Sequence, residues 1–194
     1  LTAQSELLDY YIDQFYSDAL IKPNILNLQL IKTHPERMQL EIIHRFVREH
    51  MGALPQRQIQ DIYQSMCHSC PNQYPQHVIN RLWIQRYRNA MYIIPVVEGY
   101  DRIVSSNELI NLGDCGEINN PARLPLSIEM LGDEKSKYKK HLQNYGIPNW
   151  LRVFIPYISY QDRTFIVLSE TATRLGLSWN SPDHWMVKKY EKRD

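Results

Sequence analysis

The chain has 194 residues, of which 43% are hydrophobic and 22% charged, and its formal net charge is +1. This composition is typical of a globular protein with one large or two small domains, and it excludes both a disordered chain and a membrane span, which needs about 20 consecutive apolar residues. Residues 1–115 hold ten Lys/Arg against twelve Asp/Glu, whereas residues 116–194 hold twelve against nine, so the basic half is the C-terminal one.

The first residues open directly into a helical pattern without an initiator Met, so we expect the chain to be part of a longer protein. Residues 1–8 lack the basic start and apolar core of a signal peptide, and we expect a cytoplasmic protein. Apolar residues then recur at spacings that predict an amphipathic helix of about twenty residues. Its apolar side chains are Leu7, Leu8, Tyr11, Ile12, Phe15 and Leu20.

The rest of the N-terminal half is predicted to be helical and to end in a β-hairpin. A short extended segment at 26–31 precedes Thr33-His34-Pro35-Glu36, which predicts a helix start with a Thr N-cap. That helix ends at Gly52, and the next begins at Leu54-Pro55 and breaks near Pro71. The buried stripe of this next helix is predicted to be Ile59, Ile62, Tyr63 and Met66.

The period of the apolar residues then changes from 3.6 to two. Residues 81–87 and 91–94 are predicted to form a hairpin, with Arg88-Asn89-Ala90 as its turn. Polar residues with scattered Gly, Asn and Pro follow at 98–125 and indicate a domain boundary. We therefore expect a helical domain with a hairpin at 1–105 and a small mixed α/β domain at 106–194.

The C-terminal domain is predicted to combine strands with one basic helix. The helix runs over 135–145 and is closed by Gly146, between a strand at 126–131 and a short helix or turn at Trp150. The remaining strands are expected at 153–159, 164–169 and 185–190, the first two paired through Gln161-Asp162-Arg163. The expected fold class is α+β, a mostly helical domain with a β-hairpin followed by a small mixed α/β domain.

The motifs of several catalytic and metal sites are missing, so we expect no catalytic residue and no metal site. There is no phosphate-binding glycine loop, no His-Glu-x-x-His helix and no Gly-x-Ser-x-Gly turn. Cys67-His68-Ser69-Cys70, with His77 nearby, has part of a zinc spacing, but a structural zinc site needs a second ligand pair. Three cysteines cannot all pair, which favours reduced thiols, and no basic residue flanks Cys115 to activate it. A zinc-dependent enzyme built on Cys67 and Cys70 remains an alternative.

Two groups of basic residues indicate a nucleic-acid partner, although a solvated charged surface is the common alternative. The first group falls within six residues of the basic helix, Lys135, Lys137, Lys139 and Lys140, with Arg152 beside Trp150 further on. Such a cluster is suited to phosphate contacts, which dominate nucleic-acid affinity. The second group is Arg45, Arg48, Arg57, Arg81, Arg86 and Arg88. Its helix pair and hairpin have a winged-helix outline, so a DNA-binding module is a second alternative, which the net acidic charge of that half disfavours.

Several of these motifs together resemble the C-terminal region of bacterial tRNA(Ile)-lysidine synthetases. The motifs are Lys137-Tyr138-Lys139-Lys140, Gly146-Ile147-Pro148-Asn149-Trp150-Leu151-Arg152 and Ile155-Pro156, and upstream Arg45-Phe46-Val47, Leu54-Pro55 and Arg86-Tyr87. The resemblance covers about residues 36–168 and implies a chain that recognises and positions tRNA. The nucleotide-binding catalytic domain of the family, with its Ser-Gly-Gly-x-Asp-Ser loop, has no counterpart here.

The resemblance also implies the partners and the RNA-binding residues. The full enzyme uses ATP and Mg to attach lysine to the anticodon wobble cytidine of tRNA(Ile), so this chain alone is expected to be no enzyme and to hold no cofactor. Its expected partners are tRNA and the catalytic domain, with no membrane. The residues expected to contact RNA are Lys135, Lys137, Lys139, Lys140, Trp150 and Arg152, with Arg45 and Arg86 in the first domain. Part of the family's cationic surface is replaced, since Val153-Phe154 stands where the family has Asp-Arg.

Overall fold

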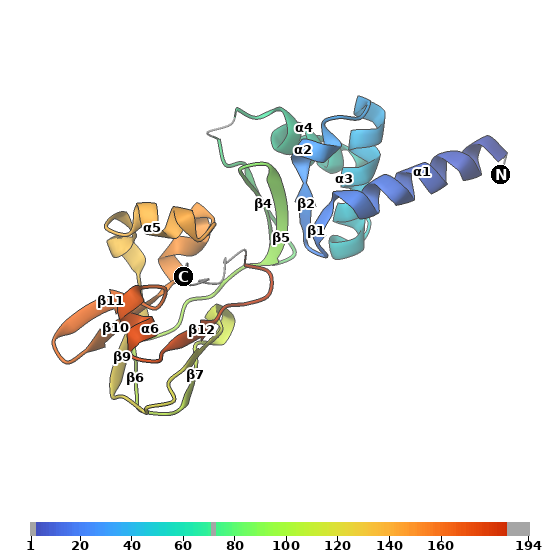
Figure 1. The fold of residues 1–194 in the computed structure, drawn as a ribbon. Coiled ribbons are helices and arrows are strands. Elements are labelled where there is room, and N and C mark those ends of the chain that lie inside the picture. Colours follow the sequence, from blue (N-terminus) through green and yellow to red (C-terminus); the bar gives the residue numbers. More distant parts are fainter. Residues whose placement is uncertain (1–2, 71–72, 186–194) are drawn as a thin grey trace. The chain divides into compact units, whose positions relative to one another are not determined.

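The computed structural model describes residues 3–70 and 73–185, and it divides the chain into two units, Leu1–Val96 and Val97–Asp194 (Figure 1). Each unit has its own helices and antiparallel sheets, which confirms the α+β class. The side chains of Leu7 and Leu8, and the strand expected at 185–190 beyond Trp185, lie outside the described residues. Within the described part, no helix is both long and apolar enough for a membrane span.

The N-terminal unit contains the predicted amphipathic helices. They are α1 (Ala3–Ala19), α3 (Glu36–Met51) and α4 (Gln56–His68), with the short α2 (Leu28–Ile31) between the first two. Tyr16 and Ala19 near the end of α1 are buried, whereas Tyr11 is 48% exposed, so its expected burial is wrong. Figure 1 shows that α1 extends beyond the other elements of its unit, and among the described side chains of α1 the buried ones lie near its C-terminal end.

The start of α3 differs from the predicted Thr cap, while its end is as predicted. Pro35 occupies the N-cap position, and its carbonyl accepts from the backbone N–H groups of Met38 and Gln39. The Thr33 hydroxyl instead donates to the Leu30 carbonyl at 2.7 Å, because Thr33 lies in the turn that closes α2. Proline suits a helix start since its fixed φ is close to helical. Gly52 ends the helix with φ +76°.

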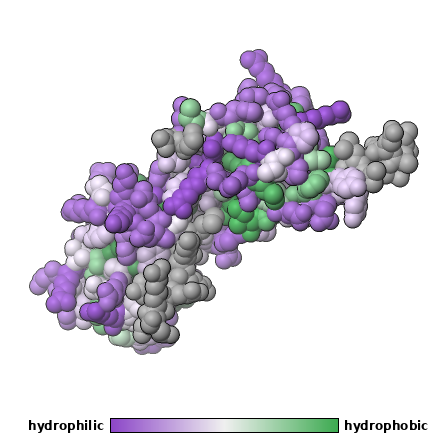
Figure 2. Space-filling view, turned by 45° about the horizontal axis from the view of Figure 1, so that its top comes forward, coloured by the Kyte–Doolittle hydropathy of each residue, from purple (hydrophilic) through white to green (hydrophobic). Residues whose placement is uncertain are grey.

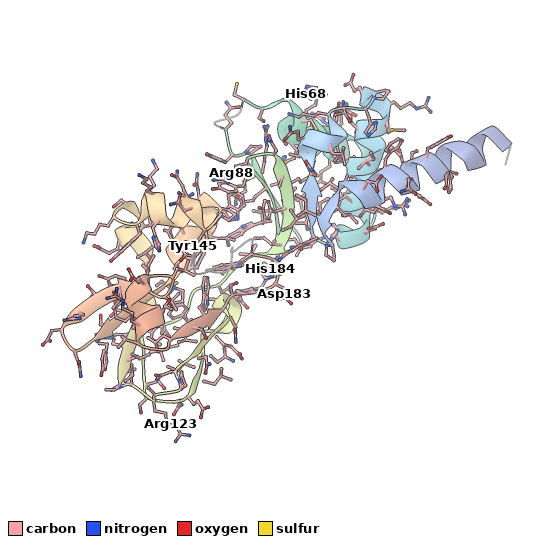
Figure 3. All side chains as sticks on the ribbon, in the orientation of Figure 1. His68, Arg88, Arg123, Tyr145, Asp183 and His184 are labelled. Atoms are coloured by element: carbon pink, nitrogen blue, oxygen red, sulfur yellow. The ribbon has the colours of Figure 1, made fainter. Side chains whose placement is uncertain are left out.

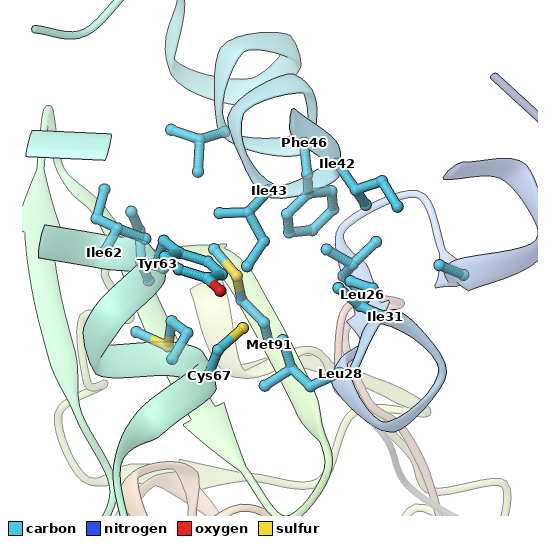
Figure 4. Close-up of a cluster of buried hydrophobic side chains, with 14 of the residues drawn as sticks. Leu26, Leu28, Ile31, Ile42, Ile43, Phe46, Ile62, Tyr63, Cys67 and Met91 are labelled. Carbon is cyan, nitrogen blue, oxygen red and sulfur yellow. The ribbon is translucent and has the colours of Figure 1, made fainter. Parts of the chain in front are cut away.

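The core of the N-terminal unit lies where α3 and α4 pack on the sheet (Figure 4). All four residues of the predicted α4 stripe are buried, and they face Ile42, Ile43 and Phe46 of α3. Cys67, at the end of α4, lies inside this cluster. The helical periodicity of the sequence therefore identified the buried face correctly.

The sheet of the N-terminal unit is larger than the predicted hairpin. Its strands are β1 (Leu20–Lys22), β2 (Ile25–Asn27), β3 (Gln76–Ile79), β4 (Leu82–Tyr87) and β5 (Ala90–Pro95), in the antiparallel order β1-β2-β5-β4-β3. The β4–β5 hairpin confirms the prediction, with a turn at Arg88-Asn89. Because both of its strands have a second neighbour, the hairpin is the interior of a sheet and not a free wing. The extended segment ends at Asn27, whose side chain accepts from two N–H groups and caps α2.

The C-terminal unit contains two small antiparallel sheets. One has the order β11-β10-β9-β6, from β6 (Ile103–Ser105), β9 (Leu126–Met130), β10 (Pro156–Tyr160) and β11 (Arg163–Ile166). The other has the order β12-β8-β7, from β7 (Leu109–Asn111), β8 (Glu117–Asn119) and β12 (Ser178–Asn180). Short helices connect the strands: η1 (Gly113–Cys115), η2 (Gly132–Ser136), α5 (Lys139–Asn144), η3 (Asn149–Phe154) and α6 (Glu170–Arg174).

The predictions for this unit are confirmed for β9 and for the β10–β11 hairpin, whose turn residues Gln161 and Asp162 both have positive φ. The helix expected at 135–145 is wrong in extent, because η2 ends at Ser136 and α5 begins only at Lys139. The region 98–125, in which the sequence indicated a domain boundary and no strand was predicted, contains three short strands. Each is only three residues long, too short to show an alternating pattern in the sequence.

Candidate nucleic-acid interface

The predicted lysine cluster lies on the segment formed by η2 and α5, with Lys135 in η2, Lys137 just after it, and Lys139 and Lys140 at the start of α5. Lys137, Lys139 and Lys140 are exposed and Lys135 is half-buried. Lys137 forms an ion pair with Glu134, and this hydrogen bond raises the pKa of the Lys137 ammonium group. Among the described residues, no carboxylate lies within 4.0 Å of Lys139 or Lys140. These two lysines thus offer charge that no acidic residue of the described part neutralises, on a surface that is mostly hydrophilic in Figure 2.

The inner side of this segment is fixed to the sheet. The rings of Tyr138 and Tyr157, on β10, are in edge contact with centroids 6.4 Å apart. Further along, the Tyr145 hydroxyl donates to the Leu168 carbonyl at 3.0 Å, and His141 Nε2 lies 3.1 Å from the same oxygen. Leu142 is fully buried between these contacts. Lys139 and Lys140 are therefore displayed by a short helix whose opposite side is anchored, and Lys137 lies just before this helix.

Arg152 lies inside the unit, unlike the lysines. It is 5% exposed, and its Nε donates to the Ile147 carbonyl at 3.1 Å. Ile147 follows Gly146, whose φ of +73° turns the chain from α5 toward η3. Trp150, also expected to contact RNA, is half-buried within η3. The position of Arg152 gives it the role of holding η3 against the end of α5.

Arg45 is surrounded by acidic and aromatic groups of the N-terminal unit. Its guanidinium group forms ion pairs with Asp13 of α1 and, at 3.2 Å, with Glu49 of α3, and it lies 4.7 Å from the ring centroid of Tyr16. The hydrogen bond to Asp13 raises the pKa of Arg45. Because two carboxylates already balance its charge, the observed geometry ties α1 to α3.

Arg86 is buried in the N-terminal unit and binds backbone carbonyls. It is 5% exposed, with Nη1 donating to Ser69 at 3.0 Å and Nε donating to Arg88 at 3.2 Å. Ser69 follows the end of α4, and Arg88 lies in the hairpin turn. Arg86 thus connects two loops, and the next residue, Tyr87, stacks on Tyr74, an exposed aromatic residue that no sequence pattern singled out.

The cysteine and histidine residues do not converge on one point. Cys67 and Cys115 are buried, and burial raises the pKa of their thiols to about 11 and about 12, while Cys70 is exposed. His77 lies 2.7 Å from the Ser65 hydroxyl, which itself donates to the Ile62 carbonyl. Within residues 3–70 and 73–185, no group of three or more His, Cys, Asp or Glu side chains could hold a metal ion.

The burial of His77 predicts a pH dependence of stability. Burial lowers the pKa of His77 from its ordinary 6.5, against a weaker opposing effect of Asp61. The unfolded state therefore binds the proton more tightly, so the free energy of unfolding should fall as pH drops below about 6.5 and level off below the folded-state pKa. Urea unfolding of wild type and His77→Gln from pH 8 to 5 measures this effect. Identical pH profiles for the two proteins would contradict it.

Parts of this chain are similar in sequence to known proteins. The family model described as the TilS substrate binding domain matches residues 26–92. Proteins named tRNA(Ile)-lysidine synthase from two strains of Vibrio cholerae serotype O1 are 21% identical over 210 residues, covering 95% of this chain and 47% of theirs. The protein of that name from Serratia proteamaculans is 23% identical over 208 residues, covering 95% of this chain and 48% of its own.

The chain thus spans about half the length of the curated relatives it matches. The match of the family model begins in β2 and ends in β5, so it lies within the N-terminal unit, while the relatives align across both units. The resemblance seen in the sequence is therefore confirmed: the chain is similar to proteins named tRNA(Ile)-lysidine synthase over 95% of its length, and its residues 26–92 match the model of the TilS substrate binding domain.

Proposed function

We propose that this chain is the tRNA-binding and tRNA-positioning region of a cytoplasmic tRNA(Ile)-lysidine synthase. The single structural observation that carries the proposal is the anchored α5 segment, which displays Lys137, Lys139 and Lys140 to solvent. The similarity to the TilS substrate binding domain and to the synthases supports tRNA as the ligand. In this proposal the lysine attachment, with its ATP and Mg, takes place in a catalytic domain outside the chain, which acts as the second partner.

The lysines act on the RNA backbone in this proposal. An ammonium group that neutralises a phosphate releases a bound counterion, which makes affinity depend on salt but not on base sequence. Arg152 and Arg86 are assigned a different role, because each is 5% exposed and bonded to backbone carbonyls. They fix the elements that carry the exposed groups and do not themselves reach a phosphate.

Replacement of the three lysines tests the proposal. Lys137→Ala, Lys139→Ala and Lys140→Ala in one protein are expected to weaken tRNA binding about tenfold or more at about 100 mM salt, and to lower the slope of log affinity against log salt by up to about one per lysine. Fluorescence anisotropy with labelled tRNA measures both values. The matched control removes the same charge at Arg102, Arg123 and Arg174, exposed residues of the same unit that each pair with a glutamate.

The two variants together decide the role of the α5 segment. Equal losses in both would mean that only the net charge matters, and full retention of tRNA by the lysine variant would remove the segment from the interface. Duplex DNA of similar length is the competitor in the same assay. Stronger binding to the duplex than to tRNA would favour the DNA-binding alternative over the tRNA proposal.

A further inference from the structure

An aromatic and cationic cluster, formed by Tyr74, Tyr87 and Arg88, lies at the turn end of the β4–β5 hairpin. The rings of Tyr74 and Tyr87 are stacked, with centroids 6.3 Å apart and an angle of 28° between their planes. The Arg88 guanidinium carbon lies 5.2 Å from the centroid of the Tyr87 ring. Tyr87 is buried, whereas Tyr74 is 45% exposed and Arg88 is exposed beside the hairpin (Figure 3).

The elements that carry this cluster are held in place by several hydrogen bonds. Arg86 connects the Arg88 carbonyl to the end of α4, and its own backbone N–H donates to the Pro75 carbonyl at 3.3 Å, next to Tyr74. On the other side of the turn, the Asn89 carbonyl accepts from Leu28 at 2.8 Å and its side chain donates to Gln29 at 3.2 Å. The turn is thus fixed to both α4 and α2, which prepares the cluster before any ligand binds.

We propose that Tyr74 and Arg88 form a stacking site for one unpaired nucleobase of RNA. This inference rests on the proposed tRNA-binding function and adds a second contact, in the N-terminal unit, of a different kind from the lysine contacts. Proteins recognise unpaired bases by stacking them on aromatic side chains or guanidinium planes. The outer face of Tyr74 supplies the aromatic surface, and Arg88 supplies a cation that binds either the base face or the adjacent phosphate.

The surroundings explain why a base fits better than an aliphatic side chain. Tyr87 is buried beneath the cluster, so it orients Tyr74 without contacting the ligand. The exposed Tyr74 offers a flat π surface, and Arg88, which contacts the Tyr87 ring on which Tyr74 stacks, adds a cation to the same cluster, a combination that suits a planar, electron-rich ring. A tRNA presents such rings in its loops and at its 3′ end, whereas a base-paired stem presents none.

The test uses a trinucleotide RNA with a central 2-aminopurine, whose fluorescence is quenched by stacking. Wild type is expected to quench this probe, and Tyr74→Leu to bind it about tenfold more weakly with little quenching, since stacking on one aromatic residue contributes about that much affinity. Tyr74→Phe keeps the ring and is expected to keep most of the quenching. The matched control is Tyr11→Leu, because Tyr11 is an equally exposed tyrosine, at 48%, on α1.

Each outcome decides the inference separately from the proposed function. The stacking site is supported if wild type and Tyr11→Leu quench the probe and Tyr74→Leu does not. Absence of quenching with wild type, or equal quenching by wild type and Tyr74→Leu, overturns it.

If the lysine variant loses tRNA while Tyr74→Leu quenches normally, the stacking site fails and the proposed function stands. If wild type quenches the trinucleotide at Tyr74 but binds no tRNA, the proposed function fails and the stacking site stands. Thermal unfolding of Tyr74→Leu checks that the variant is folded.

Discussion

Replacing Arg152 with Met is expected to lower the free energy of unfolding of the C-terminal unit by about 2–4 kcal/mol. Arg152 is 5% exposed, and its Nε–H is the partner of the buried Ile147 carbonyl. Methionine fills much of the same volume but has no donor, so the carbonyl loses its hydrogen bond without gaining water. Urea unfolding followed by circular dichroism measures the loss.

The control is Arg123→Met, which removes the same charge from an exposed residue that pairs with Glu108 at 3.2 Å. Exposed ion pairs of this kind contribute about 0–1 kcal/mol, so a small effect is expected. In the temperature range where Arg152→Met is folded, its affinity for tRNA should equal that of wild type. A variant that keeps full stability and loses tRNA would instead assign Arg152 to direct RNA contact, as the sequence resemblance implies.

The second large effect is expected for Gly116→Ala, which should destabilise the C-terminal unit by at least about 3 kcal/mol. Gly116 has φ +90° and ψ −148°, a backbone conformation that is restricted to glycine. A Cβ atom there would overlap the carbonyl oxygen of Asn180, on the neighbouring strand β12. Since this contact is with backbone, relief requires β12 to separate from β8, where Asn180 pairs with Glu117.

Gly113→Ala is the matched control for this prediction. Gly113 also has a positive φ, +60°, but a Cβ atom there would have no heavy atom within 4 Å. Only the conformational cost of about 1 kcal/mol is expected. Equal thermal stabilities of the two variants would show that the close approach of β12 to Gly116 is not maintained in solution.

The sequence predicts those parts of the fold whose signal lies within one element. In α4, the spacing of Ile59, Ile62, Tyr63 and Met66 alone defines the buried face, because helical periodicity is a local property. Strand β12 shows the opposite case. It has only three residues, and its partner β8 lies about sixty residues earlier in the chain, so no local pattern reveals the pairing. The sequence also fails to predict the break between η2 and α5. The ring of Tyr138, at this break, packs on Tyr157 of β10, which is a contact between distant residues.

For the candidate site too, the sequence predicts the features that are local and misses those that depend on distant residues. Exposed lysines in a short run are visible in the sequence, and Lys137, Lys139 and Lys140 are indeed exposed. Burial of Arg86 and Arg152 could not be anticipated, because arginine is rarely buried and the carbonyls that bind it come from turns. Tyr74 was missed since its stacking partner Tyr87 belongs to another element, and a tyrosine in a loop carries no periodic signal.

The two ends of the segment matched by the substrate binding domain lie next to each other in the sheet. It begins at residue 26 and ends at residue 92, and Leu26 pairs directly with Met91 across the β2–β5 ladder. The other pairings of this sheet join strands that follow one another along the chain, so the β2–β5 pairing is the long loop closure that sets the entropic cost of folding. Because its entry and exit lie on neighbouring strands, the chain enters and leaves the segment at the same place in the sheet, where β1 and the buried residues Tyr16 and Ala19 of α1 complete its core.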